Sequence, residues 1–324
     1  MAEADRNKYG LSVDELTTLL SRTQIAPALS SAEHQPYTVT ITQHNNAVDH
    51  VIYEVLHLDL KAGGSEKLLP HHPCFDLARR YAEKWNISGE AVNSHIQLAC
   101  GYLKFPIIML LNPAPMHEYL PFDQMVDECK TLIWIENVLS SIGLGLGDVI
   151  ILDACTLLGS DRIRELEREG RETKERALSE AYDVTEKMLQ AIKPNIILSC
   201  QCSTSFSAWS AGGHRIAVEL CSSIKRAKAG EVRHVQINDR MIDIIQAYHP
   251  SGFLNRAGHY DPSGRILKSL FRRLYIPCAN WKSRNIMASL ASLNGAVSIQ
   301  WVHHYAIENI IRGQVGGVSF VVWY

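Results

Sequence analysis

Four short apolar runs, separated by stretches of helical character, constrain the fold of this chain more than any other feature. The runs span residues 105–111, 149–152, 195–199 and 241–248, and helical patterns lie between them at about 125–139, 172–192 and 215–226. Unbroken apolar runs of this length are typical of strands that are covered on both faces. Their alternation with helices predicts an α/β fold: a three-layer sandwich with a central, mainly parallel β-sheet and helices on both faces.

The rest of the chain is assigned around this core. Residues 1–70 are predicted to form an N-terminal extension, residues 71–284 the α/β domain, and residues 285–324 a C-terminal segment docked on it. The apolar tail from Val318 to Tyr324 is expected to be an added strand or a docked segment, because an exposed apolar segment would promote aggregation. No apolar run is long enough for a membrane helix, and the first residues lack the layout of a signal peptide. We therefore expect an intracellular, soluble protein that does not contact a membrane.

Polar residues stand at the ends of the predicted strands. Asn112, Asp153 and His249 each come directly after an apolar run. In an open parallel sheet, ligands bind beyond the carboxyl ends of the strands, where such residues meet. We therefore expect Asn112 and His249 to converge across one cleft at that edge.

Two of these strand ends carry motifs that resemble a known family. Asn112–Pro115 reads Asn-Pro-Ala-Pro, and His249–Gly252 reads His-Pro-Ser-Gly. The first resembles the asparagine-type first signature of the uracil-DNA glycosylase superfamily, and the second resembles its second signature, a loop that enters the DNA minor groove. The motifs occur in the family's order, and the resemblance covers roughly the middle and later half of the chain. It implies an enzyme that flips a base out of DNA and cleaves it from the sugar.

The resemblance assigns the catalytic roles to Asn112 and His249. Cleaving a base from deoxyribose develops positive charge on the sugar and negative charge on the base, so the site needs a positioned water and a donor for the base. Asn112 matches the asparagine that orients water, and His249 matches the histidine that donates to the oxygen of the leaving pyrimidine. A neutral imidazole suffices for this donation. The alternative roles are structural: Asn112 caps the turn before Pro113, and His249 only ends a strand.

Two further residues of this region are assigned to the substrate. Phe122 occupies the place of the family aromatic that stacks on the flipped base, and such stacking tolerates different bases. A phenylalanine of the core would show the same pattern. Pro113 belongs to the first motif and adjoins Asn112.

Asp153 is also assigned to the substrate, and it departs from the family. Many members have an asparagine here, which donates to uracil O4 and accepts from N3–H. An ionised carboxylate repels O4, whereas a protonated one gives a proton to cytosine N3 and accepts from its amino group, so the preference for uracil stays open. Asp153 could instead bind water, or a backbone amide in residues 199–203 could read the base.

Contact with DNA is expected through the second motif and the helix that follows it. Phe253 and Leu254 are apolar side chains that can fill the gap left by a flipped base, and Arg256 can reach a phosphate. The segment after Pro262 has one apolar and one basic side, although an ordinary solvated helix face shows the same pattern. The residues assigned to DNA are Pro250, Ser251, Gly252, Phe253, Leu254, Arg256, Lys268 and Arg272.

Charge and cysteine content limit the other functions. The net charge of −2 and the pI near 6.7 give no overall basic signal, so DNA binding must rest on a local basic face. The eight cysteines include one close pair, Cys200 and Cys202, and such usage is typical of buried thiols in a reducing compartment. No spacing typical of a metal site is present. The resemblance likewise implies an enzyme that needs neither a metal nor an organic cofactor.

The resemblance implies a DNA glycosylase of base excision repair that acts on uracil or a related altered base, and we expect it to be a monomer in the nucleus. The first alternative is a non-catalytic member of the same fold that binds nucleic acid or a protein partner; Asp153 and the near-neutral charge favour it. The second is a hydrolase of nucleosides or similar small molecules. Phe253 and Leu254 distinguish the glycosylase from the nucleoside hydrolase. An enzyme for free nucleosides does not need an apolar wedge, that is, side chains that fill the gap left by a flipped base.

Overall fold

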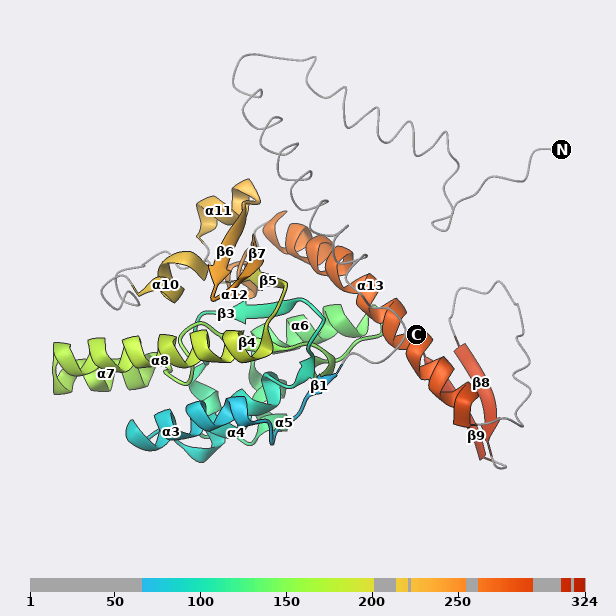
Figure 1. Ribbon diagram of the computed structural model, residues 1–324, viewed down its shortest axis with the longest axis horizontal. Coiled ribbons are helices and arrows are strands. Elements are labelled where there is room, and N and C mark those ends of the chain that lie inside the picture. Colours follow the sequence, from blue (N-terminus) through green and yellow to red (C-terminus); the bar gives the residue numbers. More distant parts are fainter. Residues whose placement is uncertain are drawn as a thin grey trace, which may run out of the picture. The chain divides into compact units, whose positions relative to one another are not determined.

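The computed structural model describes residues 66–200, 214–220, 223–254, 262–293, 310–315 and 318–323 (Figure 1). The chain divides into two units, Met1–Asn46 and Ala47–Tyr324, and every described residue belongs to the second. The predicted N-terminal extension, residues 1–70, therefore lies outside the described residues except for residues 66–70.

A five-stranded sheet forms the centre of the second unit, with the strand order β4-β3-β5-β7-β6. Its strands are β3 (Ile107–Leu110), β4 (Ile151–Asp153), β5 (Ile196–Ser199), β6 (Val232–Ile237) and β7 (Arg240–Gln246). β3, β4, β5 and β7 run parallel, and β6 pairs antiparallel with β7 at one edge. Each of the four predicted apolar runs is thus confirmed as a strand of a mixed, mostly parallel sheet.

The fifth strand, β6, was not predicted. Only Val235 and Ile237 among its residues are buried, as expected for an edge strand, so it has no continuous apolar run. Asn238 and Asp239 join it to β7, and Asn238 has a φ of 55°. Asparagine is favoured at this position of a two-residue hairpin turn because it tolerates the positive φ that the turn requires there. The Asn-Asp pair is therefore the signal that could have predicted the hairpin.

Helices surround this sheet in the chain order shown in Figure 1. The α-helices are α3 (Asp76–Lys84), α4 (Gly89–Leu98), α5 (Phe122–Glu128), α6 (Lys130–Ser140), α7 (Ser160–Glu169), α8 (Arg171–Ile192), α10 (Arg215–Leu220), α11 (Ile224–Ala229), α12 (Pro250–Leu254) and α13 (Pro262–Leu293). Short 3-10 helices are η2 (Pro73–Phe75), η3 (Pro115–Glu118) and η4 (Leu146–Asp148), and β1 (Lys67–Leu68) pairs with β2 (Gly101–Tyr102). Among the described helices, none combines the length and the apolar character that crossing a membrane requires.

Alternate residues of each strand enter different parts of the core. Ile107 and Met109 pack in one cluster with side chains of α3, α4, α7, α8 and α10. Ile108 and Leu110 pack in the other, mainly with α5, α6 and α13. We call these two sides of the sheet the Ile107 face and the Ile108 face. Because successive strand residues point to opposite faces, an unbroken apolar run is what such a sheet requires.

Three predicted elements differ in detail. The helical stretch at about 125–139 is two helices, α5 and α6, because Cys129 between them has an extended backbone. The stretch at 215–226 is likewise divided between α10 and α11. Helix α13 continues through the predicted domain boundary at residues 284 and 285.

The predicted strand in the C-terminal tail is confirmed. β9 (Val318–Trp323) pairs antiparallel with β8 (Ile310–Val315). The docking of residues 285–324 on the core stays a prediction.

Candidate functional site

The connections that leave β3 and β5 depart toward opposite faces of the sheet. After β3 the chain enters α5 and α6, whose side chains pack on the Ile108 face. After β5 the next described helix is α10, whose side chains pack on the Ile107 face. Ligands of open α/β sheets bind at such a switch point, beyond the carboxyl ends of the strands. The candidate site is therefore the carboxyl edge around β3 and β5.

Asn112 and His249 follow two parallel strands that end at this edge, β3 and β7. Met109, Ser199 and Gln246 form one row across β3, β5 and β7. Asn112 is three residues beyond Met109, and His249 is three residues beyond Gln246. Two strand intervals separate β3 from β7, which is about 10 Å at the row itself. The fold thus brings both predicted catalytic residues to the same edge, one on each side of β5.

Hydrogen bonds fix the side-chain amide of Asn112. Its Nδ2 donates to the carbonyl oxygen of Pro113 at 3.0 Å and to Ser160 Oγ at 3.4 Å. Within the described part of the chain, Asn112 Oδ1 accepts no hydrogen bond, and the side chain is partly exposed. The bond to Pro113 is the turn-capping role considered above, but it uses only the amide nitrogen. Oδ1 remains able to accept a hydrogen bond from a water molecule.

The ring of His249 is held in one tautomer. Its Nδ1 accepts the backbone N–H of Ser251 at 3.1 Å, and Ser251 Oγ lies 2.7 Å from the same nitrogen. Because a backbone N–H can only donate, Nδ1 carries no proton, and the neutral ring carries its proton on Nε2. Burial lowers the pKa of His249 to about 4. His249 is therefore a neutral imidazole at physiological pH that offers the Nε2–H group as a donor.

The second motif forms a short helix, whereas the resemblance implied a loop. Pro250 is the first residue of α12, where proline is favoured because the first helical N–H needs no partner within the helix. His249 precedes it and accepts the N–H of Ser251, which ties the ring to the helix start. α12 contacts α6 and α13. These contacts determine where the motif lies relative to the Ile108 face.

The residues of α12 differ in exposure. Pro250 is buried, Ser251 and Leu254 are partly buried, and Gly252 is exposed with open space around its Cα. The side chain of Phe253 and all of Arg256 lie outside the described residues. The apolar wedge at Phe253 and Leu254 therefore stays a prediction.

Asp153 ends β4 and faces the side of the sheet that packs on α5 and α6. It stands level with Leu110 across the strand pair, and Ile151, two residues earlier, belongs to the Ile108 face. The side chain is 7% exposed, and none of the described side or main chains gives its carboxyl group a hydrogen bond. Burial raises the pKa of Asp153 to about 7. The carboxyl group is thus protonated in a large fraction of molecules near neutral pH.

Phe122 and Pro113 line the first part of the connection that follows Asn112. Pro113 is buried. Phe122 is the first residue of α5, and its partly buried ring packs against the core of the Ile108 face. Part of its surface is therefore used in the core, as the structural alternative expected, and part remains accessible. Tyr119 in the same connection is 64% exposed.

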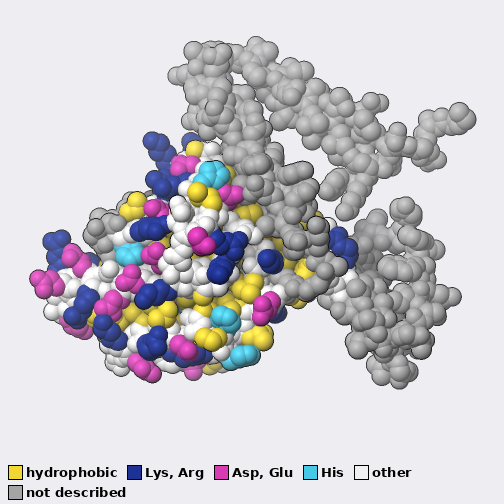
Figure 2. All heavy atoms as spheres, viewed as in Figure 1, with side chains coloured by type: hydrophobic (Ala, Val, Ile, Leu, Met, Phe, Trp, Pro, Cys, Tyr) yellow, Lys and Arg dark blue, Asp and Glu magenta, His cyan; other side chains and the backbone are white. Residues whose placement is uncertain are grey.

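Helix α13 carries the predicted basic residues on an exposed side. Its 32 residues include six basic residues and no acidic residue. Lys268 and Arg272 are exposed and form no ion pair with any described residue. The helices α7 and α8 differ, because several of their basic residues form ion pairs with acids: Arg164 with Asp161 at 2.8 Å, for example. Figure 2 shows positive and negative side chains interspersed over the face that α7 and α8 occupy.

Two serines that hold the site were missed as supporting residues. Ser160 begins α7 and accepts from Asn112, so it joins the loops after β3 and β4. Ser251 was assigned only to DNA, whereas it fixes the tautomer of His249. The spacing of Ser251 two residues after a histidine that caps a helix is a signal for the second bond. No local signal predicts the first, because it joins residues 48 positions apart.

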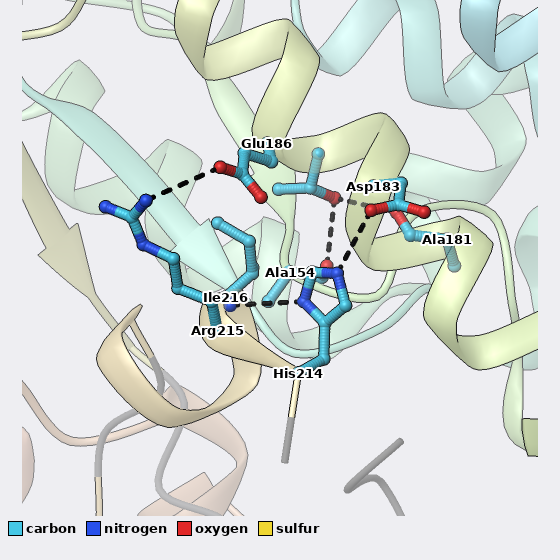
Figure 3. Close-up of polar contacts among 8 residues, drawn as sticks. Ala154, Ala181, Asp183, Glu186, His214, Arg215 and Ile216 are labelled. Carbon is cyan, nitrogen blue, oxygen red and sulfur yellow. Dashed lines mark hydrogen bonds and ion pairs between the residues drawn. The ribbon is translucent and has the colours of Figure 1, made fainter. Parts of the chain in front are cut away.

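Within the described ranges, one group of side chains has the composition of a metal site. Asp183 and Glu186 on α8 lie near His214, which precedes α10 (Figure 3). His214 Nδ1 accepts the backbone N–H of Ile216 at 3.2 Å, so its Nε2 carries the proton and donates to Asp183 at 3.2 Å. A metal would need the lone pair of that nitrogen.

The basic side chain of Arg215 also lies against the acidic residues of this group. Arg215 lies 3.8 Å from Glu186. Figure 3 marks this ion pair with a dashed line. The tautomer of His214 and the nearby guanidinium group both disfavour a metal ion. We interpret the group as a set of polar contacts that joins α8 to the start of α10.

Comparisons with known proteins add no assignment. Models of known protein families do not match this chain, and no curated protein matches it.

Proposed function

We propose that the protein is a DNA glycosylase of the uracil-DNA glycosylase type, which hydrolyses the bond between an altered base and its deoxyribose. The observation that carries the proposal is the pairing of a neutral Nε2–H donor at His249 with an amide at Asn112 on one sheet edge. The proposed fold is a three-layer sandwich, supported by core clusters on both the Ile107 and Ile108 faces. The resemblance of the two motifs points to the same family.

Each residue would supply what this reaction requires. Asn112 Oδ1 accepts a hydrogen bond from water and directs the water oxygen toward the sugar; an amide is too weak a base to remove the proton fully. His249 Nε2–H donates to the base oxygen on which negative charge develops as the bond breaks. The tautomer of His249 is fixed before substrate binds, so this donor needs no rearrangement during the reaction.

The proposed substrate determines the remaining assignments. DNA is the partner, and α13 would meet its phosphates through Lys268 and Arg272. α12 would approach the gap left by the flipped base, and Phe122 would stack on the base. We propose that the protein acts as a monomer in the nucleus, where its substrate is. The reaction requires no metal or organic cofactor.

Substitutions at the two catalytic positions test the proposal. Oligonucleotides that contain uracil, hypoxanthine, xanthine or a thymine mismatch are incubated with the protein, and abasic sites are then cleaved with alkali. Asn112→Ala and His249→Ala should each reduce release of every base that the wild type removes by about 100-fold or more, because each removes an interaction with the transition state. Asn93→Ala and His71→Ala, at exposed positions, are the matched controls.

The outcomes separate this proposal from the alternatives. Release of bases at the same rate by Asn112→Ala and by wild type would contradict the assigned site. Binding of DNA without release of any base would favour the non-catalytic alternative. Cleavage of free nucleosides, with DNA left intact, would favour the small-molecule hydrolase.

A further inference from the structure

The proposed reaction still needs a group that takes a proton from the attacking water. Asn112 can orient this water, but an amide is too weak a base to remove the proton. A carboxylate close to Asn112 would supply the base. Glu118 is the last residue of η3 and follows Asn112 in the same connection between β3 and α5.

Contacts at the start of α7 bring the carboxyl group of Glu118 to the surroundings of Asn112. Gly159 precedes α7, and a Cβ atom on this glycine would lie 2.8 Å from Glu118 Oε1 and 3.7 Å from the carbonyl oxygen of Pro113. That carbonyl oxygen accepts the hydrogen bond from Asn112 Nδ2, and Ser160, the residue after Gly159, is the second partner of the amide. The carboxyl group of Glu118 and the amide of Asn112 therefore lie against the same two places, the carbonyl group of Pro113 and the start of α7.

The main chain of Glu118 is held in place, whereas its carboxyl group is not. Ser88 Oγ donates to the main-chain oxygen of Glu118 at 2.7 Å. The same hydroxyl group caps α4 by accepting the N–H of Ala91 at 3.1 Å, so the end of η3 is tied to the start of α4. Among the described residues, none forms a hydrogen bond with the carboxyl group of Glu118, which is partly exposed. Its oxygens remain able to accept a proton.

The surroundings make Glu118 a stronger base than an ordinary glutamate. Burial raises the pKa of Glu118, and the carboxylates of Glu165 and Asp161 on α7 raise it further. Arg162, also on α7, lowers this pKa in part. The helices α4 and α5 also contact η3, and no charged group of either helix contributes to the shift. The neighbouring His117 is neutral, because burial lowers its pKa to about 4.

Resting on the proposed glycosylase function, we propose that Glu118 is the general base that removes a proton from the water oriented by Asn112. The water oxygen bonds to C1′ of the deoxyribose, and one proton of the water moves to the carboxylate of Glu118. The bond between C1′ and the base breaks, and its electron pair leaves with the base, whose oxygen accepts the Nε2–H group of His249. Glu118 then gives its proton through solvent to the released base, which restores the carboxylate. Base and sugar are thus released as in simple hydrolysis.

Rates of base release between about pH 4.5 and 8.5 test this role. The full chain is incubated with oligonucleotides that carry uracil, hypoxanthine, xanthine or a thymine mismatch, and the base released fastest is followed. Glu118→Gln keeps the shape of the side chain but cannot take the proton, so it should lose about 100-fold or more of the rate at neutral pH. The ratio of wild-type to variant rate should fall about tenfold per unit below the pKa of Glu118, because the protonated carboxyl group is no longer a base. Glu128→Gln, at an exposed position of α5, is the matched control.

Two further variants separate a base from a structural residue. Gly159 has a φ of −72° and a ψ of 161°, which alanine also adopts, so Gly159→Ala should fold and displace the carboxyl group of Glu118 that its Cβ would meet. It should slow base release by about tenfold or more, whereas Gly147→Ala, which places its Cβ in open space, should not. Sodium formate supplies a free carboxylate and should restore part of the activity of Glu118→Ala, but none of that of Asn112→Ala.

The possible failures are distinct. If Glu118→Gln, shown to be folded by its melting temperature, releases the base as wild type does at every pH, the inference is wrong and the glycosylase function stands. A loss of rate that is equal at every pH, without rescue of Glu118→Ala by formate, would show a structural role and also overturn the inference. If wild type releases no base from any of the oligonucleotides, the proposed function and the inference both fail.

Discussion

Asn112 and His249, at the edge of the sheet, are each held by a hydrogen bond to one polar atom of the side chain. A second polar atom of each side chain remains available to a ligand. Asn112 uses Nδ2 and keeps Oδ1, and His249 uses Nδ1 and keeps Nε2–H. In each case the holding bond is to a residue one or two positions away in the chain. The local turn therefore sets the free donor of His249, and the amide of Asn112 is held both by its own turn and by Ser160 from the start of α7.

Gln246 has no such partner among the described residues. It ends β7, is 1% exposed, and both polar atoms of its amide lack a hydrogen bond within that part of the chain. Replacing it by methionine, which has a similar volume, should raise the free energy of unfolding by about 1–3 kcal/mol, because no unsatisfied amide is then buried. Urea denaturation measures the change. A decrease would show that the amide has a partner in the folded protein, and Gln97→Met, at a partly exposed position, is the control.

Helix α13 has one side that packs in the core and another side that carries basic residues. One side packs Leu267, Leu270 and Phe271 against the Ile108 face. The other side presents basic residues with no acid anywhere in the helix. A protein with a net charge of −2 can thus have a positive surface locally, because the acids are placed on other helices such as α8.

Reversing charge on α13 should weaken DNA binding. Lys268→Glu with Arg272→Glu should lower affinity and reduce the slope of log affinity against log salt by about 1.5, because two phosphate contacts are lost. Titration of a labelled oligonucleotide at several salt concentrations measures this. The matched control is Lys187→Glu with Lys225→Glu, which changes the net charge equally at exposed positions of α8 and α11. Equal effects of both pairs would contradict a specific role for α13.

For the whole molecule, buried histidines couple folding to pH. His95 on α4 and His117 in η3 are each 5% exposed, and burial lowers the pKa of each to about 4. An unfolded histidine has a pKa near 6.5, so between about pH 6.5 and 4 the unfolded chain binds protons that the folded chain does not. Stability contributed in this way is complete above pH 6.5 and is lost as the pH falls. Asp153 has the opposite effect on stability. Its raised pKa lets the folded state hold a proton between about pH 4 and 7 that the unfolded state lacks, so its contribution to the free energy of unfolding increases as the pH falls.

Acid unfolding should show these opposing contributions. Each histidine should lower the free energy of unfolding by up to about 1.4 kcal/mol per pH unit between pH 6 and 4.5, and Asp153 should offset about one of them. His95→Leu should therefore make the loss shallower, and Asp153→Asn should make it steeper. Urea denaturation at a series of pH values measures both. An unchanged slope in His95→Leu would show that His95 is protonated in the folded protein or is not buried.

The sequence alone determined the α/β class, the four parallel strands and the residues that end them, because buried strands need unbroken apolar runs and their ends need polar turns. It did not determine β6, whose exposed face removes the apolar run, or the break between α5 and α6. The tertiary structure decided that Asn112 and His249 follow strands on either side of β5 and lie at the same edge of the sheet, because strand order depends on pairing between distant segments. It also decided the protonation of Asp153: the residue type allows either state, and only the burial of its carboxyl group favours the neutral one.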